Sequence, residues 1–319
     1  MKNPRLNLSF QFGRYRFFVI GKIRKFLIFP IRLLRAFDTK LWEINSKDYE
    51  NSLRLQHTRV KTSTKYDMSA EPGEDYYAGQ YLSRLEMYLA NTGKIDCIAD
   101  FGCGQGRLAI PLAKRFPQAT VVGVDLSFEA LKIANLAADN FELGNIKFIQ
   151  SPIGNYVVSI AESSLDLAIF TEVAFYLPDW KAILEQIVAK LAPGGILMAS
   201  FRSTYFTLML QIRARNFQSA IQILNSGFGR VTPEDDLIFT WVNSSELRNF
   251  CEQQGLQLLD LFGIGTSSGI PGDIFDDFAQ PGLLIEEELL ILEKIENKYS
   301  QILPDVGRYV TIIIQKPTI

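Results

Sequence analysis

The sequence predicts an α/β fold with a doubly wound, mostly parallel, seven-stranded sheet. Seven short apolar segments have the composition of buried strands. Most of them are separated by stretches whose apolar residues recur at helical spacing. Short apolar strands that alternate with helices form a parallel sheet covered on both faces, because each crossover helix packs back onto the sheet.

The predicted elements follow a regular order from residue 76 onward. Ser127 is a good N-cap for one helix, and the apolar residues from Trp180 to Leu191 recur at helical spacing in another. The residues "APGG" at 192–195 are expected to end that second helix. Helices are expected at 76–91, 107–116, 127–140, 179–191, 243–255 and about 283–303. Strands are expected at 94–101, 120–126, 146–150, 165–173, 195–201, 256–265 and 308–316.

The chain is expected to hold an N-terminal extension at 1–60 and one domain at 61–319. The regular alternation breaks after the fifth strand, and residues 202–240 are predicted to form an insertion with helical character. A second insertion is expected at 263–303. Five glycines and two prolines within 263–282 indicate that it begins as a loop.

The N-terminal extension is basic and apolar. Residues 1–40 hold ten Lys/Arg and one acid, a net charge of +9, which leaves −11 for the other 279 residues. Its apolar uncharged run "FLIFPI" is too short for a signal segment of ~7–15 residues or a membrane span of about 20. Three interpretations stay open, namely a helix in the membrane headgroup layer, an arm packed on the domain, and a nucleic-acid contact.

The cysteines and the histidine argue against a metal site. Cys97, Cys103 and Cys251 are too few and too scattered for a disulfide framework or a metal knuckle. His57 is the one histidine of the sequence and cannot form a histidine-based site alone. We therefore expect reduced thiols, no bound metal and a cytoplasmic protein, with peripheral membrane contact through residues 1–40 as one possibility.

Three glycines at every second position follow the first strand. Gly102, Gly104 and Gly106 come directly after "ADF", which contains Asp100. Glycine permits left-handed backbone and lets a ligand approach the main chain without a Cβ in the way. Because N–H groups at the start of the next helix favour a negative group, the turn is predicted to bind a carboxylate or a phosphate.

The spacing separates this turn from dinucleotide-binding turns. Those need a third glycine where Arg107 stands. Asp100 would repel a pyrophosphate and suits a ligand with a positive amino group. Asp125 closes the second strand, where a carboxylate can accept hydrogen bonds from both hydroxyls of a ribose. A ribose joined to a zwitterionic amino acid indicates S-adenosylmethionine.

With these motifs the sequence resembles the class I S-adenosylmethionine-dependent methyltransferases, a Rossmann-like family. "DFGCGQGR" is similar to the family's glycine-rich first motif and "GVDLS" to its ribose-binding segment. "LDLAIFTEVAFYLPD" resembles the fourth strand with its following loop, and "LAPGGILMASF" the fifth strand with its preceding turn. The resemblance covers residues 76–200, and more loosely 241–319, where it implies a final antiparallel strand.

The resemblance implies a cofactor site for S-adenosylmethionine. The three glycines would lie against the methionine part, and Asp100 would orient their loop or the amino group of the ligand. Asp125 would hold the ribose with Leu126 beside the adenine, and Glu172 would lie near the methionine end. The expected site residues are Asp100, Gly102, Gly104, Gly106, Asp125, Leu126, Ser151 and Glu172.

One departure from the family concerns the adenine. The family often has an acid after the third strand that reaches the adenine amino group, whereas "FIQSPIGN" holds no acid. Ser151, Asn155 or backbone groups would have to bind the adenine, and the sequence does not choose among them.

The acceptor is inferred by elimination. The loop after the fourth strand lacks the [ND]-P-P-[YF] motif of adenine, cytosine-amino and glutamine methylases, and it has no cysteine nucleophile for C5 methylation. No cluster of acids and histidine indicates a magnesium-assisted catechol enzyme. We therefore expect a small-molecule or lipid-like acceptor, no nucleic acid, and an in-line displacement that needs mainly an aligned nucleophile.

The acceptor pocket is expected between the extension, residues 202–240 and residues 263–282. No catalytic residue is assigned, because no candidate base stands out. The candidate bases are Glu172, Tyr176, Tyr205, Asp235 and Asp273. Aromatic residues that could line the pocket or form a local core are Tyr205, Phe206, Phe217, Phe228, Phe239, Trp241 and Phe275.

Two other function classes stay open. One is a non-catalytic scaffold with the same fold that binds the cofactor or a partner, and a scaffold that has lost the cofactor would give no heat when S-adenosylmethionine is added. A nicotinamide-dependent oxidoreductase would be stabilised by NAD(H), and Arg107 at the position of the third glycine argues against it.

Overall fold

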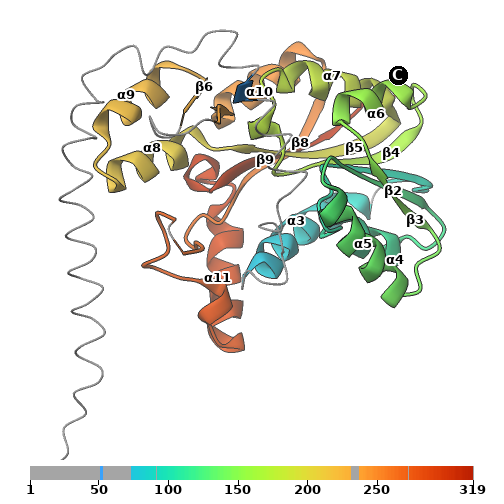
Figure 1. Cartoon of the computed structure of the whole chain (residues 1–319), viewed down its shortest axis with the longest axis horizontal. Helices are drawn as coiled ribbons and strands as arrows, with labels where there is room; N and C mark the ends of the chain where they lie inside the picture. Colours follow the sequence, from blue (N-terminus) through green and yellow to red (C-terminus); the bar gives the residue numbers. More distant parts are fainter. Residues whose placement is uncertain (1–50, 53–72, 91, 231–236, 272, 319) are drawn as a thin grey trace, which may run out of the picture. The chain divides into compact units, whose positions relative to one another are not determined.

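Figure 1 shows the computed structural model of the chain. It describes residues 51–52, 73–90, 92–230, 237–271 and 273–318. The chain divides into two compact units, Met1–Asn45 and Ser46–Ile319. The membrane contact expected through residues 1–40, and His57, lie outside the described residues, and the boundary at residue 60 stays a prediction.

The sheet has seven strands in the order β3-β2-β1-β4-β5-β9-β8. The strands from β3 to β5 are parallel neighbours, and β9 lies antiparallel between β5 and β8. The predicted doubly wound sheet with one antiparallel strand is therefore confirmed. The strands are β1 Cys97–Phe101, β2 Thr120–Asp125, β3 Ile146–Gln150, β4 Leu165–Phe170, β5 Leu191–Arg202, β8 Gln257–Ile264 and β9 Tyr309–Gln315.

The helices alternate with the strands as the sequence predicts. Ser127 caps α5 by accepting the Ala130 N–H, and Asn243 and Glu246 form a capping box at the start of α10. The main helices are α3 Glu74–Leu89, α4 Ala109–Arg115, α5 Phe128–Asn140, α6 Ile153–Ser159, α7 Trp180–Lys190, α10 Ser244–Gln253 and α11 Glu286–Tyr299. Among the described helices, none combines the length and the apolar composition needed to cross a bilayer.

The helices cover both faces of the sheet, as Figure 1 shows. On one face α3, α4 and α5 pack their buried residues against Ile196 and Met198 of β5. On the other face α6, α7 and α10 pack against Leu197 and Ala199 of the same strand. Side chains alternate along a strand, so Ser200 and Arg202, which follow Ile196 and Met198 at two-residue intervals, project from the same face, that of α3.

Two elements differ from the sequence prediction. The strand β5 begins at Leu191 and includes "APGG", because Leu191 still pairs with Leu165 across a register shift. Gly194 accommodates this irregularity with a φ of 80°, in the left-handed region. The helix α6 was not predicted, since its seven residues are too few to display helical periodicity.

The insertion after β5 is helical, as predicted. It consists of α8 Thr204–Arg213, α9 Phe217–Asn225 and a two-residue hairpin, β6 Phe228–Gly229 with β7 Phe239–Thr240. The buried Trp241 side chain anchors α9, because its indole N–H donates to the Ser226 carbonyl at 2.6 Å. Ser52, within the predicted extension, accepts the Ile238 N–H and so contacts this insertion.

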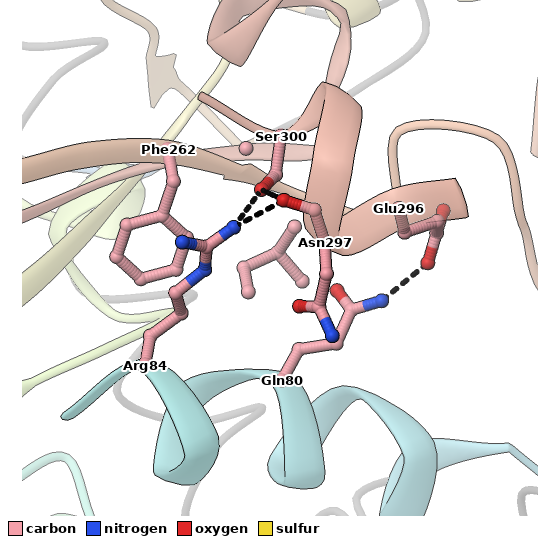
Figure 2. A pocket seen from close by; sticks show the side chains of 8 residues that line it. Gln80, Arg84, Phe262, Glu296, Asn297 and Ser300 are labelled. Carbon is pink, nitrogen blue, oxygen red and sulfur yellow. Dashed lines mark hydrogen bonds between the residues drawn. The ribbon is translucent and has the colours of Figure 1, made fainter. Parts of the chain in front are cut away.

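The helix α11 is tied to α3 through side chains (Figure 2). Arg84 donates to the Asn297 carbonyl and to the Ser300 hydroxyl, both at 2.6 Å. The buried Glu296 carboxylate accepts hydrogen bonds from Gln80 and, at 2.7 Å, from Tyr76. The polar groups around this narrow pocket therefore bind one another and fix α11, which lies within the second insertion, against α3.

Candidate functional site

The sheet topology gathers the predicted site residues at one edge. Strands β1, β2, β4 and β5 are parallel, so their carboxyl ends meet there. Asp100 and Asp125 lie at the ends of β1 and β2, and Glu172 follows β4 by two residues. Arg202 ends β5, and Tyr309 begins the antiparallel strand β9 at the same edge. In open α/β sheets, ligands bind at this edge.

The three glycines of the turn after β1 all have left-handed backbone, with φ of 83°, 53° and 84°. A Cβ on Gly102 would lie 2.9 Å from Val173, and one on Gly106 would lie 2.9 Å from Ile110. A Cβ on Gly104 would have no heavy atom within 4 Å. Gly102 and Gly106 therefore serve close packing, whereas Gly104 borders open space through which a ligand can approach its backbone.

Asp125 binds the glycine turn directly. One carboxylate oxygen accepts the Gly104 N–H and the other accepts the Ser127 N–H, each at 2.8 Å. Burial raises the pKa of Asp125, and backbone hydrogen bonds from Ser127, Gly104 and Leu126 oppose that shift. A carboxylate has about four lone-pair sites, so Asp125 can still accept a hydrogen bond from a ligand hydroxyl while it holds the turn.

Asp100 lies beneath the turn, with 3% of its surface exposed. Burial raises the pKa of Asp100 to about 7, while Arg107 and the Ala109 N–H lower it and Asp125 raises it further. The bond from Ala109 places Asp100 at the start of α4. This position favours the first of its two expected roles, which is to orient the loop.

Leu126 and Ser151 lie side by side at the ends of β2 and β3. The Ser151 N–H donates to the Asp125 carbonyl at 3.1 Å, and the Leu126 carbonyl accepts from Gln150 at 3.1 Å. The Ser151 hydroxyl donates to the Pro152 carbonyl, and Asn155 is exposed. The choice among these groups for the adenine stays open.

Glu172 has an unusual backbone for a residue with a side chain, with a φ of 56°. Such left-handed residues store about 1–3 kcal/mol of strain and cluster at functional sites. The Glu172 N–H donates to the Ser200 hydroxyl at 2.8 Å, and its carboxylate lies 2.7 Å from the Arg107 guanidinium. Tertiary contacts thus hold this side chain in place at the edge.

Arg107 has a role that the sequence analysis missed. Its guanidinium forms ion pairs with Glu74 at 2.6 Å and with Glu172, and only 12% of its side chain is exposed. Burial alone would lower the pKa of Arg107, but the two carboxylates more than reverse that and raise it. The sequence analysis treated Arg107 only as a missing glycine, and no spacing signal linked it to Glu74.

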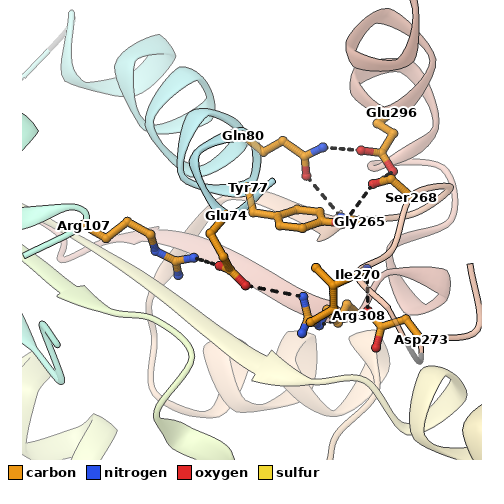
Figure 3. A network of polar contacts seen from close by, with 10 residues as sticks. All are labelled: Glu74, Tyr77, Gln80, Arg107, Gly265, Ser268, Ile270, Asp273, Glu296 and Arg308. Carbon is orange, nitrogen blue, oxygen red and sulfur yellow. Dashed lines mark hydrogen bonds and ion pairs between the residues drawn. The ribbon is translucent and has the colours of Figure 1, made fainter. Parts of the chain in front are cut away.

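The network extends to the start of β9 (Figure 3). The Arg308 guanidinium lies 3.4 Å from Asp273 and 4.0 Å from Glu74, and it stacks over the ring of Tyr77. Glu74 is therefore shared by two arginines. These contacts join α3, the glycine turn, the second insertion and β9 around the same edge.

An aromatic cluster lies next to this network. The Phe175 ring is stacked on Tyr309, with centroids 5.8 Å apart, and also contacts Tyr176 and Phe239. Of the aromatic residues expected to line the acceptor region, Phe206 and Trp241 are buried, so they form local core. The exposed ones are Tyr205, Phe217 and Phe228.

The described tyrosines of this edge, Glu172 and Asp273 are poorly suited to accept a proton. Burial raises the pKa of the hydroxyls of Tyr77, Tyr81 and Tyr309 above their ordinary range. The carboxylates of Glu172 and Asp273 are paired with arginines. Within the described ranges, no group of three His, Cys, Asp or Glu side chains could hold a metal ion, and the three cysteines are free thiols.

Comparison with known proteins agrees with the fold. The family model "Methyltransferase domain" matches residues 96–237. The chain is 32% identical to a trans-aconitate 2-methyltransferase of Azoarcus sp. over 108 residues, which are 34% of this chain and 40% of that protein. It is 26% identical over 242 residues to the tRNA 5-carboxymethoxyuridine methyltransferase of Escherichia coli K12, covering 73% of this chain and 85% of that protein.

A solved structure shares the fold over most of the chain. The plantazolicin methyltransferase BamL, crystallised with a triazolic desmethylPZN analogue and S-adenosylhomocysteine (SAH), superposes with a TM-score of 0.51 at 17% identity. The match covers 86% of this chain and 99% of that one.

Proposed function

Because the chain belongs to the class I S-adenosylmethionine-dependent methyltransferase family, we propose that it transfers a methyl group to a small-molecule or lipid-like acceptor. The observation that carries this proposal is the open space over Gly104, bordered by the Asp125 carboxylate at the carboxyl edge of the sheet. The chain spans 40% of the length of the trans-aconitate relative from Azoarcus, so a common acceptor is not assumed.

The residues at the edge fit S-adenosylmethionine, which supplies an electrophilic methyl group on a sulfonium centre. Asp125 offers lone pairs to a ribose diol, and Gly104 exposes backbone where a Cβ would intrude. The Glu172 carboxylate offers hydrogen-bond acceptors near the turn, which suits a ligand with a positive amino group, while Asp100 orients the turn. The chain itself would bind and orient the donor. Because Glu172 and Asp273 are paired with arginines, they would not act as bases beside it.

Two observations support a small-molecule or lipid-like acceptor. The Azoarcus relative carries the name of a small organic acid, trans-aconitate. The loop after β4, Thr171–Tyr176, lacks the motif of base and glutamine methylases. The Escherichia coli relative is named for a tRNA nucleoside, so a labelled macromolecule would contradict this part of the proposal.

A lipid-like acceptor is also supported by an apolar surface on α9. Phe217, Ile221 and Leu224 recur at i, i+4 and i+7 and are 61%, 53% and 65% exposed. The sequence places a segment of net charge +9 at residues 1–40. Apolar side chains together with basic residues bind anionic lipid surfaces, so we propose a peripheral contact with such a membrane.

Calorimetry with SAH tests the cofactor part of the proposal. Wild-type protein should bind SAH, and Asp125→Ala should weaken binding at least tenfold because it removes the carboxylate that faces the ribose. Asp139→Ala, an exposed aspartate on α5, is the matched control and should leave the affinity unchanged. Equal affinities of wild-type protein and Asp125→Ala would refute the cofactor site.

A further inference from the structure

Arg202 lies at the acceptor side of the sheet edge. It ends β5 and stands opposite Tyr309 in the register with β9. Side chains two residues apart share a face, so Arg202 projects from the same face as Ser200, whose hydroxyl accepts the Glu172 N–H. Arg202 therefore lies two residues beyond the Ser200 that contacts Glu172. Its strand, β5, is separated from β1 and β2 by β4.

The Arg202 guanidinium has aromatic neighbours and an unmet hydrogen-bonding group. Its Cζ lies 5.9 Å from the ring centroid of Phe175 and 5.7 Å from that of Phe206. Its Nε is buried without a hydrogen-bond partner, and no carboxylate of the described residues pairs with it. Arg107 and Arg308 at the same edge are both paired with acids.

A buried guanidinium donor without a partner is unfavourable, and an anion would satisfy it. Arginine binds carboxylates with strong, charge-assisted hydrogen bonds. The rings of Phe175 and Phe206 exclude water around the guanidinium, which strengthens such a contact. The site is therefore suited to a carboxylate with an apolar or compact remainder.

Among the described side chains of this edge, neither Glu172 nor Asp273 is free to deprotonate a neutral acceptor. The Glu172 carboxylate is held by Arg107 and that of Asp273 by Arg308. The tyrosine hydroxyls nearest the network have pKa values raised by burial. A hydroxyl acceptor would require a base, whereas a carboxylate is already ionised at neutral pH.

We propose that the acceptor carries a carboxylate that binds Arg202 and is converted to its methyl ester. This inference rests on the proposed function. One oxygen of the carboxylate binds the guanidinium, and a lone pair of the other forms the bond to the methyl carbon. The carbon–sulfur bond breaks with its electron pair on sulfur, so the products are a neutral ester and SAH, and no proton moves.

The carboxylate can belong to a small organic acid or to a fatty acid. Methyl esters release volatile methanol in mild alkali, whereas methyl ethers and N-methyl groups do not. Wild-type protein is therefore incubated with methyl-labelled S-adenosylmethionine and either an aqueous or a lipid extract of cells. Each product is treated with alkali, and the volatile label is counted. The extract that yields the volatile label identifies the source.

Arg202→Gln should lower the volatile label about 10–100-fold, as expected for a lost charge-assisted hydrogen bond. Arg202→Lys should restore part of it because the charge is kept. Both variants should bind SAH within about twofold of wild-type protein, which also shows that they fold. Arg115→Gln, which changes an exposed arginine on α4, is the control and should keep full activity.

Two results would overturn the carboxylate proposal while leaving the methyltransferase function intact. One is a transferred label that resists alkali. The other is an Arg202→Gln variant with undiminished volatile label. Failure of wild-type protein to bind SAH would instead refute the proposed function, and the carboxylate proposal with it.

Discussion

The Arg107 guanidinium lies 2.7 Å from the Glu172 carboxylate, so the residue that follows the glycine turn binds the residue that follows β4. The same guanidinium lies 2.6 Å from Glu74 at the start of α3. Three segments far apart in the sequence are thereby joined at the edge of the sheet, and Figure 3 shows the pair of Arg107 with Glu74.

Loss of this buried link should destabilise the protein. Arg107→Gln leaves the little-exposed Glu172 carboxylate without its arginine and leaves Glu74 with Arg308 alone, which costs about 3 kcal/mol in the free energy of unfolding. Arg115→Gln removes a pair with Glu86 whose arginine is 59% exposed, and should cost less than about 1 kcal/mol. Urea denaturation measures both values. Equal losses in the two variants would show that the Arg107 link is not structural.

Gly104 and Gly255 provide a matched pair for the open space at the turn. Both have left-handed backbone, with φ of 53° and 63°, and a Cβ on either meets no atom within 4 Å. Alanine should therefore lower the free energy of unfolding by about 1 kcal/mol at both positions. Only Gly104→Ala should weaken SAH binding, by tenfold or more in calorimetry, because its methyl group enters the ligand space. An unchanged affinity would place the ligand elsewhere.

Asp100 should make stability depend on pH. The pKa of Asp100 is about 7 in the folded protein, above about 3.9 in the unfolded chain, so the folded state binds the proton more tightly. The free energy of unfolding, relative to that of Asp100→Asn, should fall as pH rises from 4 to 7 and level off above that. The total change is at most about 4 kcal/mol. Parallel pH profiles of the two proteins would contradict a buried, protonatable Asp100.

The apolar surface of α9 should contribute to membrane binding. The triple variant Phe217→Ser, Ile221→Ser and Leu224→Ser should reduce co-flotation with vesicles that contain phosphatidylglycerol, because it removes exposed apolar area. Phe128→Ser and Leu136→Ser change equally exposed residues on α5 and should leave flotation unchanged. If both sets of changes act alike, the contact is not specific to α9.

The order of the helices and strands could be predicted from the sequence because each element forms for a local physical reason. Buried parallel strands are short apolar runs, and Ser127 and Asn243 mark helix starts through their own side chains. The residue at which β5 begins could not be predicted, because the pairing of Leu191 with Leu165 depends on a neighbouring strand. The helix α6 was likewise too short for a periodic signal.

The glycine turn and Asp125 were predicted from spacing, and the structure brings them into contact through the Gly104 N–H. The partners of Arg107 and the unmet Nε of Arg202 were not predicted. Arg107 meets residues more than 30 positions away, and the sequence pattern does not indicate which charges meet in space.

The sequence by itself determined the alternating fold and the ligand turn, since strand composition, helix periodicity and the conformational freedom of glycine are local properties. Tertiary structure alone decided which charges are neutralised at the sheet edge. Arg107 and Arg308 meet carboxylates there and Arg202 does not, because parallel strands bring their carboxyl ends together from distant parts of the chain.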